Sequence, residues 1–299
     1  MEQIRSDVQS ELENDLVELD QVGMSDIQIS LDFDGLLIPA KLSVFVNLKA
    51  GHRGIHMSRL YELILQHVHG QKVSQFQWPQ LLNLLVDSQK GLSQSAHLEL
   101  DYQLPLKRMS LKSGLHGHRN YILKSKFLLD QRKSHVLSIH QQDFEILYSS
   151  TCPQSTQLAK ELTKNYFADR EASELVDWMQ TGKSFVATPH AQRSRMKISL
   201  QSTASTVLQV APWINALEAV LQTPVQTAVK KADEMEFARL NAENPMFCED
   251  ALRRVSHYIN KRMTEDHCLL AYKIETSHEE SLHSHNAAGM IKSKNFLQF

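Results

Sequence analysis

The sequence predicts an α+β protein in which one unit, ordered strand, strand, helix, helix, strand, strand, occurs twice. The first observation is that segments with apolar residues at every second position flank segments with apolar residues at helical spacing. The second is that this order returns in the second half of the chain, although no residue-level identity between the halves is visible. Two copies of one αβ unit are therefore the expected architecture.

Length and composition fit two domains. The chain has 299 residues, of which 42% are hydrophobic and 22% charged, enough for two ordinary domains with full cores. The polar and acidic start, residues 1–24, predicts an arm that lies on the surface or on a neighbouring subunit. We expect the first module over residues 25–132 and the second over residues 133–299, with a polar, helix-prone insert at about residues 156–185.

In the first module, residues 27–31 and 42–48 alternate in polarity and are separated by the turn signal Asp34-Gly35, which predicts a β-hairpin. Two helices are expected next. The first spans about residues 58–68, and the second starts near Pro79, a residue that is tolerated in a first helical turn. Residues 96–102 and 121–127 then supply two more strands.

In the second module, strands are expected at residues 136–148, 196–200, 268–274 and 287–291. Pro212 opens a predicted helix with Trp213 and Leu217 on one face. Asn244 and Pro245 resemble the N-cap and first turn of another helix. That helix would carry the apolar positions Phe247, Ala251, Val255 and Ile259.

Charge and cysteine content exclude several classes of function. The net charge of −2 gives no basic field for nucleic acid or an anionic membrane, so any phosphate site must be local. The three cysteines, Cys152, Cys248 and Cys268, form no spaced framework, which favours the reducing cytoplasm. The N-terminus does not resemble a signal peptide, and no apolar stretch approaches the length of a membrane span.

Cys152 lies where an alternating apolar run ending at Tyr148 gives way to small hydroxyl residues and Pro153. This pattern is typical of a strand that leaves a sheet and enters a helix. An isolated cysteine is more often a small buried hydrophobe than a reactive group. Other residues of the chain favour chemistry, because sulfur, imidazole and carboxylate together suit a borderline metal. These companions are His190, Glu234, Glu249 and the cluster from Glu280 to His285.

The chain resembles the GTP cyclohydrolase type IB family over nearly its whole length. Seven segments carry the resemblance in the family's order: VGMS at 22–25, RGIHMSR at 53–59, TCPQS at 151–155, PHAQRS at 189–194, VKKADE at 229–234, NPMFCED at 244–250 and ESLHSH at 280–285. The resemblance implies tunnelling-fold modules, with antiparallel sheets that carry helices on one face and close into barrels between subunits. It also implies a homotetramer with sites at subunit interfaces.

The implied reaction opens the guanine imidazole ring of GTP by hydrolysis, releases formate and forms 7,8-dihydroneopterin triphosphate. Neutral water attacks this ring poorly, so one divalent metal per site, manganese, zinc or iron, is expected. The resemblance implies Cys152 and His190 as ligands, with Glu234 as the third. His190 could instead be a structural imidazole, and Glu234 a solvated helix charge. Gln154 stands where many members have a second thiol, so that thiol is no required ligand here.

Guanine presents two parallel donors, which a carboxylate can accept, and the resemblance favours Glu249 for this contact. An acid at that position could equally complement a helix dipole. Proton transfer needs a group that titrates near neutrality, and His283 is the candidate, with Glu280 orienting it or reaching the metal. His278 and His285 are nearby, so the cluster could also be an exposed polar loop.

The triphosphate requires cations. The candidates are Arg193 and Arg59, then His56 and Lys230, and each could be a solvated surface charge instead.

Two other classes of function remain open. One is a tunnelling-fold nitrile reductase, which would use Cys152 as a nucleophile with NADPH. His190 and Glu234 argue against it, since a thioimide mechanism needs no metal ligands. The other is a non-catalytic scaffold or binding protein, in which Cys152 would be an inert core residue. Metal content and the response of Cys152 to alkylating reagents separate these alternatives.

Overall fold

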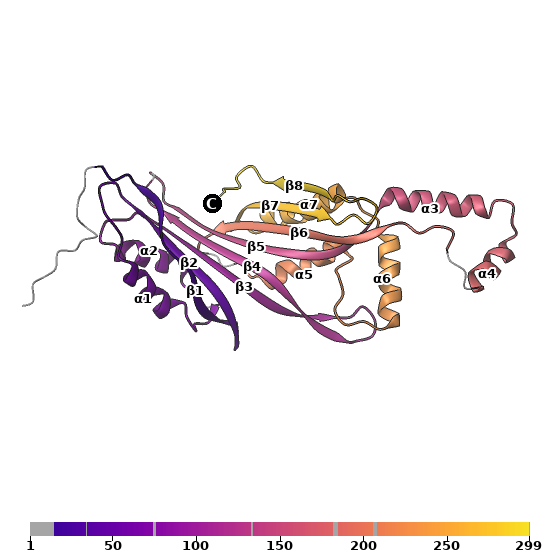
Figure 1. The fold of residues 1–299 in the computed structure, drawn as a ribbon, viewed down its shortest axis with the longest axis horizontal. Helices are drawn as coiled ribbons and strands as arrows, with labels where there is room; N and C mark the ends of the chain where they lie inside the picture. Colours follow the sequence, from indigo (N-terminus) through magenta and orange to yellow (C-terminus); the bar gives the residue numbers. More distant parts are fainter. Residues whose placement is uncertain are drawn as a thin grey trace, which may run out of the picture.

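The computed structural model describes residues 15–33, 35–73, 76–132, 134–181, 185–205 and 208–298. Its centre is one antiparallel sheet of eight strands in the order of the sequence, β1 to β8 (Figure 1). Each strand therefore pairs with its neighbours in the chain. The strands are β1 Leu19–Phe33, β2 Leu36–Leu48, β3 Ser95–Met109, β4 His116–Asp130, β5 Leu137–Thr151, β6 Ala191–Thr203, β7 Leu269–His278 and β8 Ala287–Lys292.

The pairing register carries one apolar face across the sheet. In the first half, Val44 of β2 lies opposite Leu98 of β3, and Leu98 lies opposite Phe127 of β4. In the second half, Ile198 of β6 lies opposite Ile274 of β7. All five side chains are buried. Since side chains alternate between the faces of a strand, the matched register places the core on one face and leaves the other open.

Helices α1 Met57–His67, α2 Trp78–Ser88, α5 Val210–Leu221 and α7 Cys248–Glu265 supply the apolar residues that cover this face (Figure 1). Leu60 and Ile64 of α1 are four residues apart and fully buried, as the helical spacing predicts. Glu218 joins the two halves. It is buried on α5 and makes ion pairs of 3.3 Å with both Arg108 and Arg119 of the β3–β4 hairpin.

The insert forms two helices, α3 Pro153–Tyr166 and α4 Ala172–Gln180, which extend beyond the end of the sheet (Figure 1). An aromatic cluster packs them together, with ring centroids of Phe167 and Trp178 5.5 Å apart. α3 begins directly after β5, so Cys152 sits at a strand-to-helix junction, as the sequence predicts.

The extent of a further helix, α6 Lys231–Glu243, was not predicted, although a helix around Glu234 was considered. Most of its residues are polar and exposed, and few apolar residues recur at helical spacing. Tertiary contacts hold its first turn. The buried carboxylate of Asp233 accepts hydrogen bonds from the backbone N–H groups of Lys112 (2.7 Å), Ser113 (2.9 Å) and Lys230 (2.8 Å). These contacts bind α6 to the β3–β4 turn.

The predicted α+β class and the repeated order of elements are confirmed, but several boundaries differ. β1 already begins at Leu19, where it pairs with Leu48, so the predicted arm over residues 1–24 ends earlier; residues 1–14 lie outside the described part of the chain. The strands are longer than predicted, because β3 and β4 continue beyond the core as a hairpin.

The helix expected from Asn244 begins instead at Cys248. Asn244 follows the end of α6, and its side chain donates to the carbonyl of Leu221 rather than capping a helix. Phe247, expected on the buried face, is 45% exposed.

The proposed module boundary at 132/133 falls between β4 and β5 and stays a prediction; Lys133 itself is not described, nor are residues 182–184 of the insert. Within the described ranges, no helix is both long and apolar enough to cross a membrane.

Candidate active site

A pocket of about 400 Å³ lies where β5 ends, β6 begins and α7 starts. Thr151 and Ala191 are paired at this edge of the sheet, and the Cys152 N–H donates to the carbonyl of His190 at 3.1 Å. A parallel bridge between Thr151 and Pro245 brings in the start of α7. The five predicted site residues that line this pocket are Cys152, His190, Glu249, Glu280 and His283.

Cys152 occupies the N-cap position of α3, and Pro153 is the first residue of the helix. Its sulfur accepts the Ser155 N–H at 3.5 Å. The N–H groups at a helix N-terminus favour negative charge, and a thiolate is the form of cysteine that binds metals. The helix thus prepares the sulfur for the role of a ligand.

Two neighbours orient His190. Its Nδ1 lies 3.1 Å from Oε1 of Gln192 and 3.7 Å from Oε2 of Glu280. Both partners are acceptors, which favours the tautomer with hydrogen on Nδ1 and leaves the Nε2 lone pair for a ligand. The Gln192 amide in turn donates to Ser150 at 3.0 Å. A metal-binding histidine is commonly held in this way.

Behind the pocket, the core face of the sheet becomes polar. His278 is 2% exposed, and its Nε2 and Nδ1 lie 2.9 Å from the Tyr148 hydroxyl and 3.2 Å from the Ser150 hydroxyl, respectively. Burial lowers the pKa of His278 to about 4, although the nearby Glu249 carboxylate acts in the opposite direction. At neutral pH this imidazole is therefore uncharged.

Glu249 stands in the first turn of α7, exposed, on the wall of the pocket. Its own backbone N–H, and then the Cys248 thiol that donates to Oε2 at 3.3 Å, lower the pKa of this carboxyl. Burial, together with the neighbouring Glu249, raises the pKa of Cys248 to about 11. The arrangement keeps an ionised acceptor on Glu249 beside a protonated thiol.

The cluster after β7 closes the other side of the pocket. The rings of His283 and His285 stack with centroids 4.9 Å apart, and both are exposed. Glu280 is half-buried between this cluster and His190. The histidines can thus reach a bound molecule and exchange protons with solvent.

Glu234 and Lys230 do not line this pocket in the same chain. Both are exposed at the start of α6 beside the β3–β4 turn, while the end of α6 leads toward the pocket. Glu234 and Glu243 are nine residues apart, a rise of roughly 14 Å along a helix. That distance separates Glu234 from the end of α6 nearest Cys152.

The remaining cationic candidates also lie elsewhere. Arg193 is exposed on β6 between the buried Gln192 and Ser194, so its side chain projects from the open face of the sheet. His56 and Arg59 follow the end of β2. β2 and β5 are three antiparallel steps apart and run in opposite directions, so these residues stand at the far end of the sheet, where Figure 1 shows α1.

A family model described as type I GTP cyclohydrolase folE2 matches residues 6–289. The chain belongs to the FolE2 family of type I GTP cyclohydrolases. The family expected from the seven segments is thereby confirmed at this level, as is the expectation of a GTP cyclohydrolase.

Named members of the FolE2 family align over most of this chain. The GTP cyclohydrolase FolE2 of Pseudoalteromonas translucida is 38% identical over 284 residues, which cover 90% of each chain. That of Pseudomonas putida is 36% identical over 290 residues, covering 94% of this chain and 93% of the relative. Among solved structures, a hyperthermostable urate oxidase mutant from Bacillus sp. TB-90 matches with a TM-score of 0.50 and 7% identity, over 93% of this chain and 99% of that one. This likeness concerns the fold alone and agrees with the tunnelling-fold expectation.

The pocket of this FolE2 chain contains the types of donor atom that a divalent ion needs, but these atoms do not yet form a complete ligand set. Sulfur, imidazole and carboxylate are present as Cys152, His190 and Glu280, and the free nitrogen of His190 is set by its neighbours. Among the described residues, no three acidic, histidine or cysteine side chains already stand in metal-binding geometry. The donor chemistry therefore fits, while a complete ligand set needs a side-chain shift or a group from another chain.

Two residues of the FolE2 site were missed from the sequence: Gln192, two positions after His190, and Cys248, which precedes Glu249. His278 was noted beside the histidine cluster, but the exposed polar loop considered there is wrong for it, because it is 2% exposed. Strand alternation could have identified Gln192. The contacts of His278 depend on the β5–β6–β7 register, which sequence alone does not give.

Proposed function

We propose that this protein is a metal-dependent GTP cyclohydrolase of the type IB class. It converts GTP and water to 7,8-dihydroneopterin triphosphate and formate, the first step of tetrahydrofolate biosynthesis. The observation that carries the proposal is the convergence of Cys152, His190 and Glu280 on one pocket with Glu249 on its wall, in a chain of the FolE2 family. The relatives at 36% and 38% identity are named GTP cyclohydrolases.

Cys152 and His190 would hold one divalent ion, with Glu234 as the proposed third ligand and Glu280 as the acid already near His190. Bound there, manganese, zinc or iron would lower the pKa of a water molecule and polarise the attacked carbon. Within one chain, Glu234 stands roughly 14 Å along α6 from the helix end nearest Cys152. In this proposal it therefore reaches the ion from a second subunit or through movement of α6.

Glu249 would hold the guanine edge. Its pKa is lowered, so the carboxylate is ionised at neutral pH and can accept the two parallel donors of guanine. The open position of Glu249 on the pocket wall leaves room for a flat base. Phe247, exposed on the same wall, offers an apolar surface against the ring.

His283 would carry protons between the substrate and solvent. It is exposed and lines the pocket, whereas His278 is buried and neutral and is suited to accept or donate a hydrogen bond rather than act as an acid. Glu280 is placed to orient His190 and stands three residues before His283.

The positions of the phosphate-binding candidates support sites shared between subunits, and the assembly proposed is the homotetramer that the family resemblance implies. Arg59 and His56 stand at the opposite end of the sheet from Cys152, and Arg193 projects from the opposite face. A second subunit must therefore present some of these cations if they contact the triphosphate of a GTP bound beside Cys152.

The deciding experiment incubates the purified protein with GTP and manganese and measures pterin fluorescence and formate. Cys152→Ala should abolish turnover, by at least a thousandfold, while far-ultraviolet circular dichroism and the melting temperature stay close to wild type. Cys268→Ala is the matched control, because Cys268 lies outside the pocket and this variant should remain active. Normal formate release by Cys152→Ala would remove this thiol from the mechanism.

The same preparation tests the alternatives. A nitrile reductase would consume NADPH with a nitrile-bearing deazaguanine and would need no metal. A scaffold protein would release no formate and would leave Cys152 unreactive toward iodoacetamide.

A further inference from the structure

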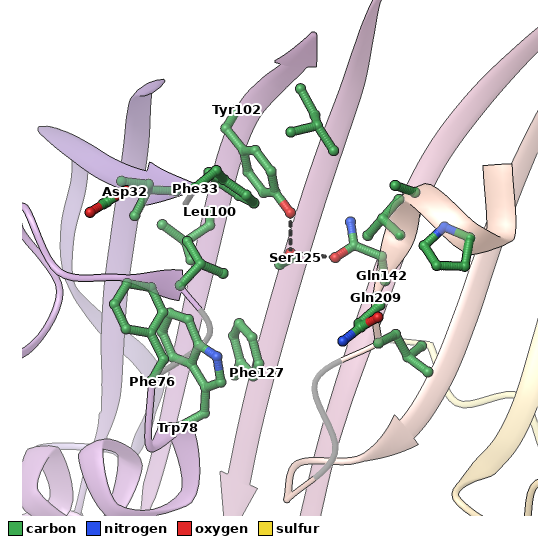
Figure 2. A pocket seen from close by; sticks show the side chains of 17 residues that line it. Asp32, Phe33, Phe76, Trp78, Leu100, Tyr102, Ser125, Phe127, Gln142 and Gln209 are labelled. Carbon is green, nitrogen blue, oxygen red and sulfur yellow. Dashed lines mark hydrogen bonds between the residues drawn. The ribbon is translucent and has the colours of Figure 1, made fainter. Parts of the chain in front are cut away.

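A second pocket, also about 400 Å³, lies on the helix-covered face of the sheet between α2 and the start of α5 (Figure 2). This pocket is separate from the Cys152 pocket, because the two have no lining residue in common. Its volume is within the range of small-molecule sites. We propose that it binds a flat, uncharged aromatic molecule that carries a hydrogen-bond acceptor on one edge.

Aromatic rings form one side of this pocket. Trp78 stacks on Phe127 with ring centroids 4.1 Å apart and planes 17° from parallel, and Phe76 meets Trp78 edge to face at 4.7 Å. Trp78 and Phe127 are almost fully buried, at 2% and 1% exposed. The His140 ring also stacks on Phe127, with centroids 4.5 Å apart, so a ligand meets these fixed rings at their edges, and a flat molecule can do so without displacing them.

Polar groups form the opposite side, where Figure 2 shows Tyr102, Ser125 and Gln142 in a row. Ser125 donates to Oε1 of Gln142 at 2.6 Å, and the Gln142 amide donates to the backbone carbonyls of Lys124 and Asp143. The capacity of Gln142 is therefore largely used within the protein.

Two buried hydrogen-bond donors of the pocket, the Tyr102 hydroxyl and the Trp78 indole N–H, have weak partners or none among the described residues. The Tyr102 hydroxyl makes a long contact of 3.5 Å with Ser125 and a smaller interaction with the Gln142 side chain, and burial raises the pKa of the phenol, so it stays protonated. Nε1 of Trp78 has no hydrogen-bond partner among the described residues. A buried donor without a partner is costly, so a ligand that supplies an acceptor, such as a ring nitrogen or a carbonyl, is favoured.

The charges around this second pocket exclude GTP, the substrate proposed for the Cys152 pocket. Among the described residues that line the pocket there is no lysine, arginine or histidine, and their one carboxylic acid is Asp32, whose Oδ1 accepts the Gly35 N–H. An anion would be desolvated here without a counter-charge. GTP and other phosphorylated molecules are therefore unsuitable, and this inference does not depend on the reaction proposed for the Cys152 pocket.

Three probes of similar shape test the inference by calorimetric titration of the full-length protein. Quinoline is uncharged at pH 7.5 and has an acceptor nitrogen, naphthalene lacks the acceptor, and 2-naphthoate is anionic. We expect quinoline to bind about three- to tenfold more tightly than naphthalene, corresponding to one net hydrogen bond. Binding of 2-naphthoate should be weaker than that of both. Saturation with GTP should leave quinoline bound.

Variants locate the binding. Tyr102→Phe should reduce the preference for quinoline over naphthalene by at least threefold. The control is Tyr272→Phe, because Tyr272 is also buried but forms its hydrogen bond with Ser256 outside the pocket; this variant should leave the preference unchanged. Ala211→Phe fills the pocket and should weaken the binding of both uncharged probes, quinoline and naphthalene, at least tenfold. Ala219→Phe, on the exposed side of the same helix, is its control.

Thermal unfolding verifies that each variant folds, and Leu104→Phe replaces Ala211→Phe if that variant does not. Wild-type binding by the filled variant, equal binding of 2-naphthoate, or displacement of quinoline by GTP would each overturn the inference.

Discussion

At the scale of single residues, the neighbours of His190 set the tautomer and orientation of its imidazole. One nitrogen faces the acceptors Gln192 and Glu280, so the other remains available for a ligand. Cys152 is similar, because its sulfur faces the N–H of Ser155 at the start of α3. In both cases the neighbours, rather than the residue type alone, prepare the side chain for metal binding.

Glu249 provides a test of the guanine contact. Glu249→Gln keeps the shape of the side chain but replaces one acceptor oxygen with a donor, which would oppose the donors of guanine. We expect KM for GTP to rise about a hundredfold, with metal content unchanged. Glu265→Gln, at the exposed end of the same helix, should retain wild-type kinetics. Loss of metal from Glu249→Gln would mean that the anchor and ligand roles are exchanged.

The lowered pKa of His278 predicts that the stability of the fold depends on pH. Its pKa is about 4 in the folded protein, below the ordinary value of 6.5, so the unfolded chain binds a proton that the folded chain does not. Stability should therefore be unaffected by this group above pH 6.5. It should fall by up to about 1.4 kcal/mol for each pH unit between 6.5 and 4.

Urea unfolding in the presence of a chelator measures this dependence without a contribution from bound metal. His278→Gln should lose this part of the pH profile, while His257→Gln, which alters an exposed residue of α7, should keep it. Parallel profiles for wild type and His278→Gln would contradict the assignment.

At the scale of elements, the junctions between strands and helices place the chemistry. β5 ends one residue before Cys152, β6 begins one residue after His190, and α7 begins one residue before Glu249. These three boundaries meet at one edge because β5 and β6 are paired and Met246 donates its N–H to the carbonyl of Thr151 at 2.9 Å. A site built on element ends is held by the sheet while its side chains face solvent.

The pairing of β1 with β2 depends on Gly23. A Cβ at this position would overlap with the carbonyl oxygen of Val44 and lie 2.8 Å from Cα of Phe45. Because both are backbone atoms, Gly23→Ala must push the strands apart, and we expect a loss of about 1–3 kcal/mol in the free energy of unfolding. Ser25→Ala, on the exposed part of the same strand, should change little. Equal denaturation midpoints for the two variants would show that the strand pair relaxes without cost.

At the scale of the whole molecule, one continuous sheet joins both halves of the chain and separates the candidate residues widely. Cys152 and Glu249 gather at the end of the sheet where α3 starts, and His56 and Arg59 stand at the other end. Figure 1 shows α3 and α1 at these opposite ends. A rigid sheet cannot bring its two ends together within one chain. If both groups act on one GTP, they must come from different chains.

Subunit mixing tests this arrangement. Cys152→Ala and Arg59→Ala should each be inactive alone, but co-refolding them should restore up to about a quarter of the wild-type activity, because some hybrid sites receive both native residues. Mixing Cys152→Ala with His190→Ala is the control. Both residues line the pocket of one chain, so no hybrid site is complete and no activity should return. Absence of recovery in the first mixture would show that Cys152 and Arg59 do not complete one site across a subunit interface.

The sequence by itself determined the α+β class, the repeated order of elements, the family and the pocket residues Cys152, His190, Glu249, Glu280 and His283. These follow from local periodicity, from residues at strand and helix ends, and from motifs whose order is retained along the chain. Tertiary structure alone decided the extent of α6, which Asp233 holds through three backbone N–H groups, and the start of α7 at Cys248. It also decided that His278 is buried and neutral, and that Glu234 and Arg59 stand far from Cys152 in the same chain. The physical reason is that burial, hydrogen-bond partners and strand direction depend on contacts between distant segments, which local sequence patterns do not encode.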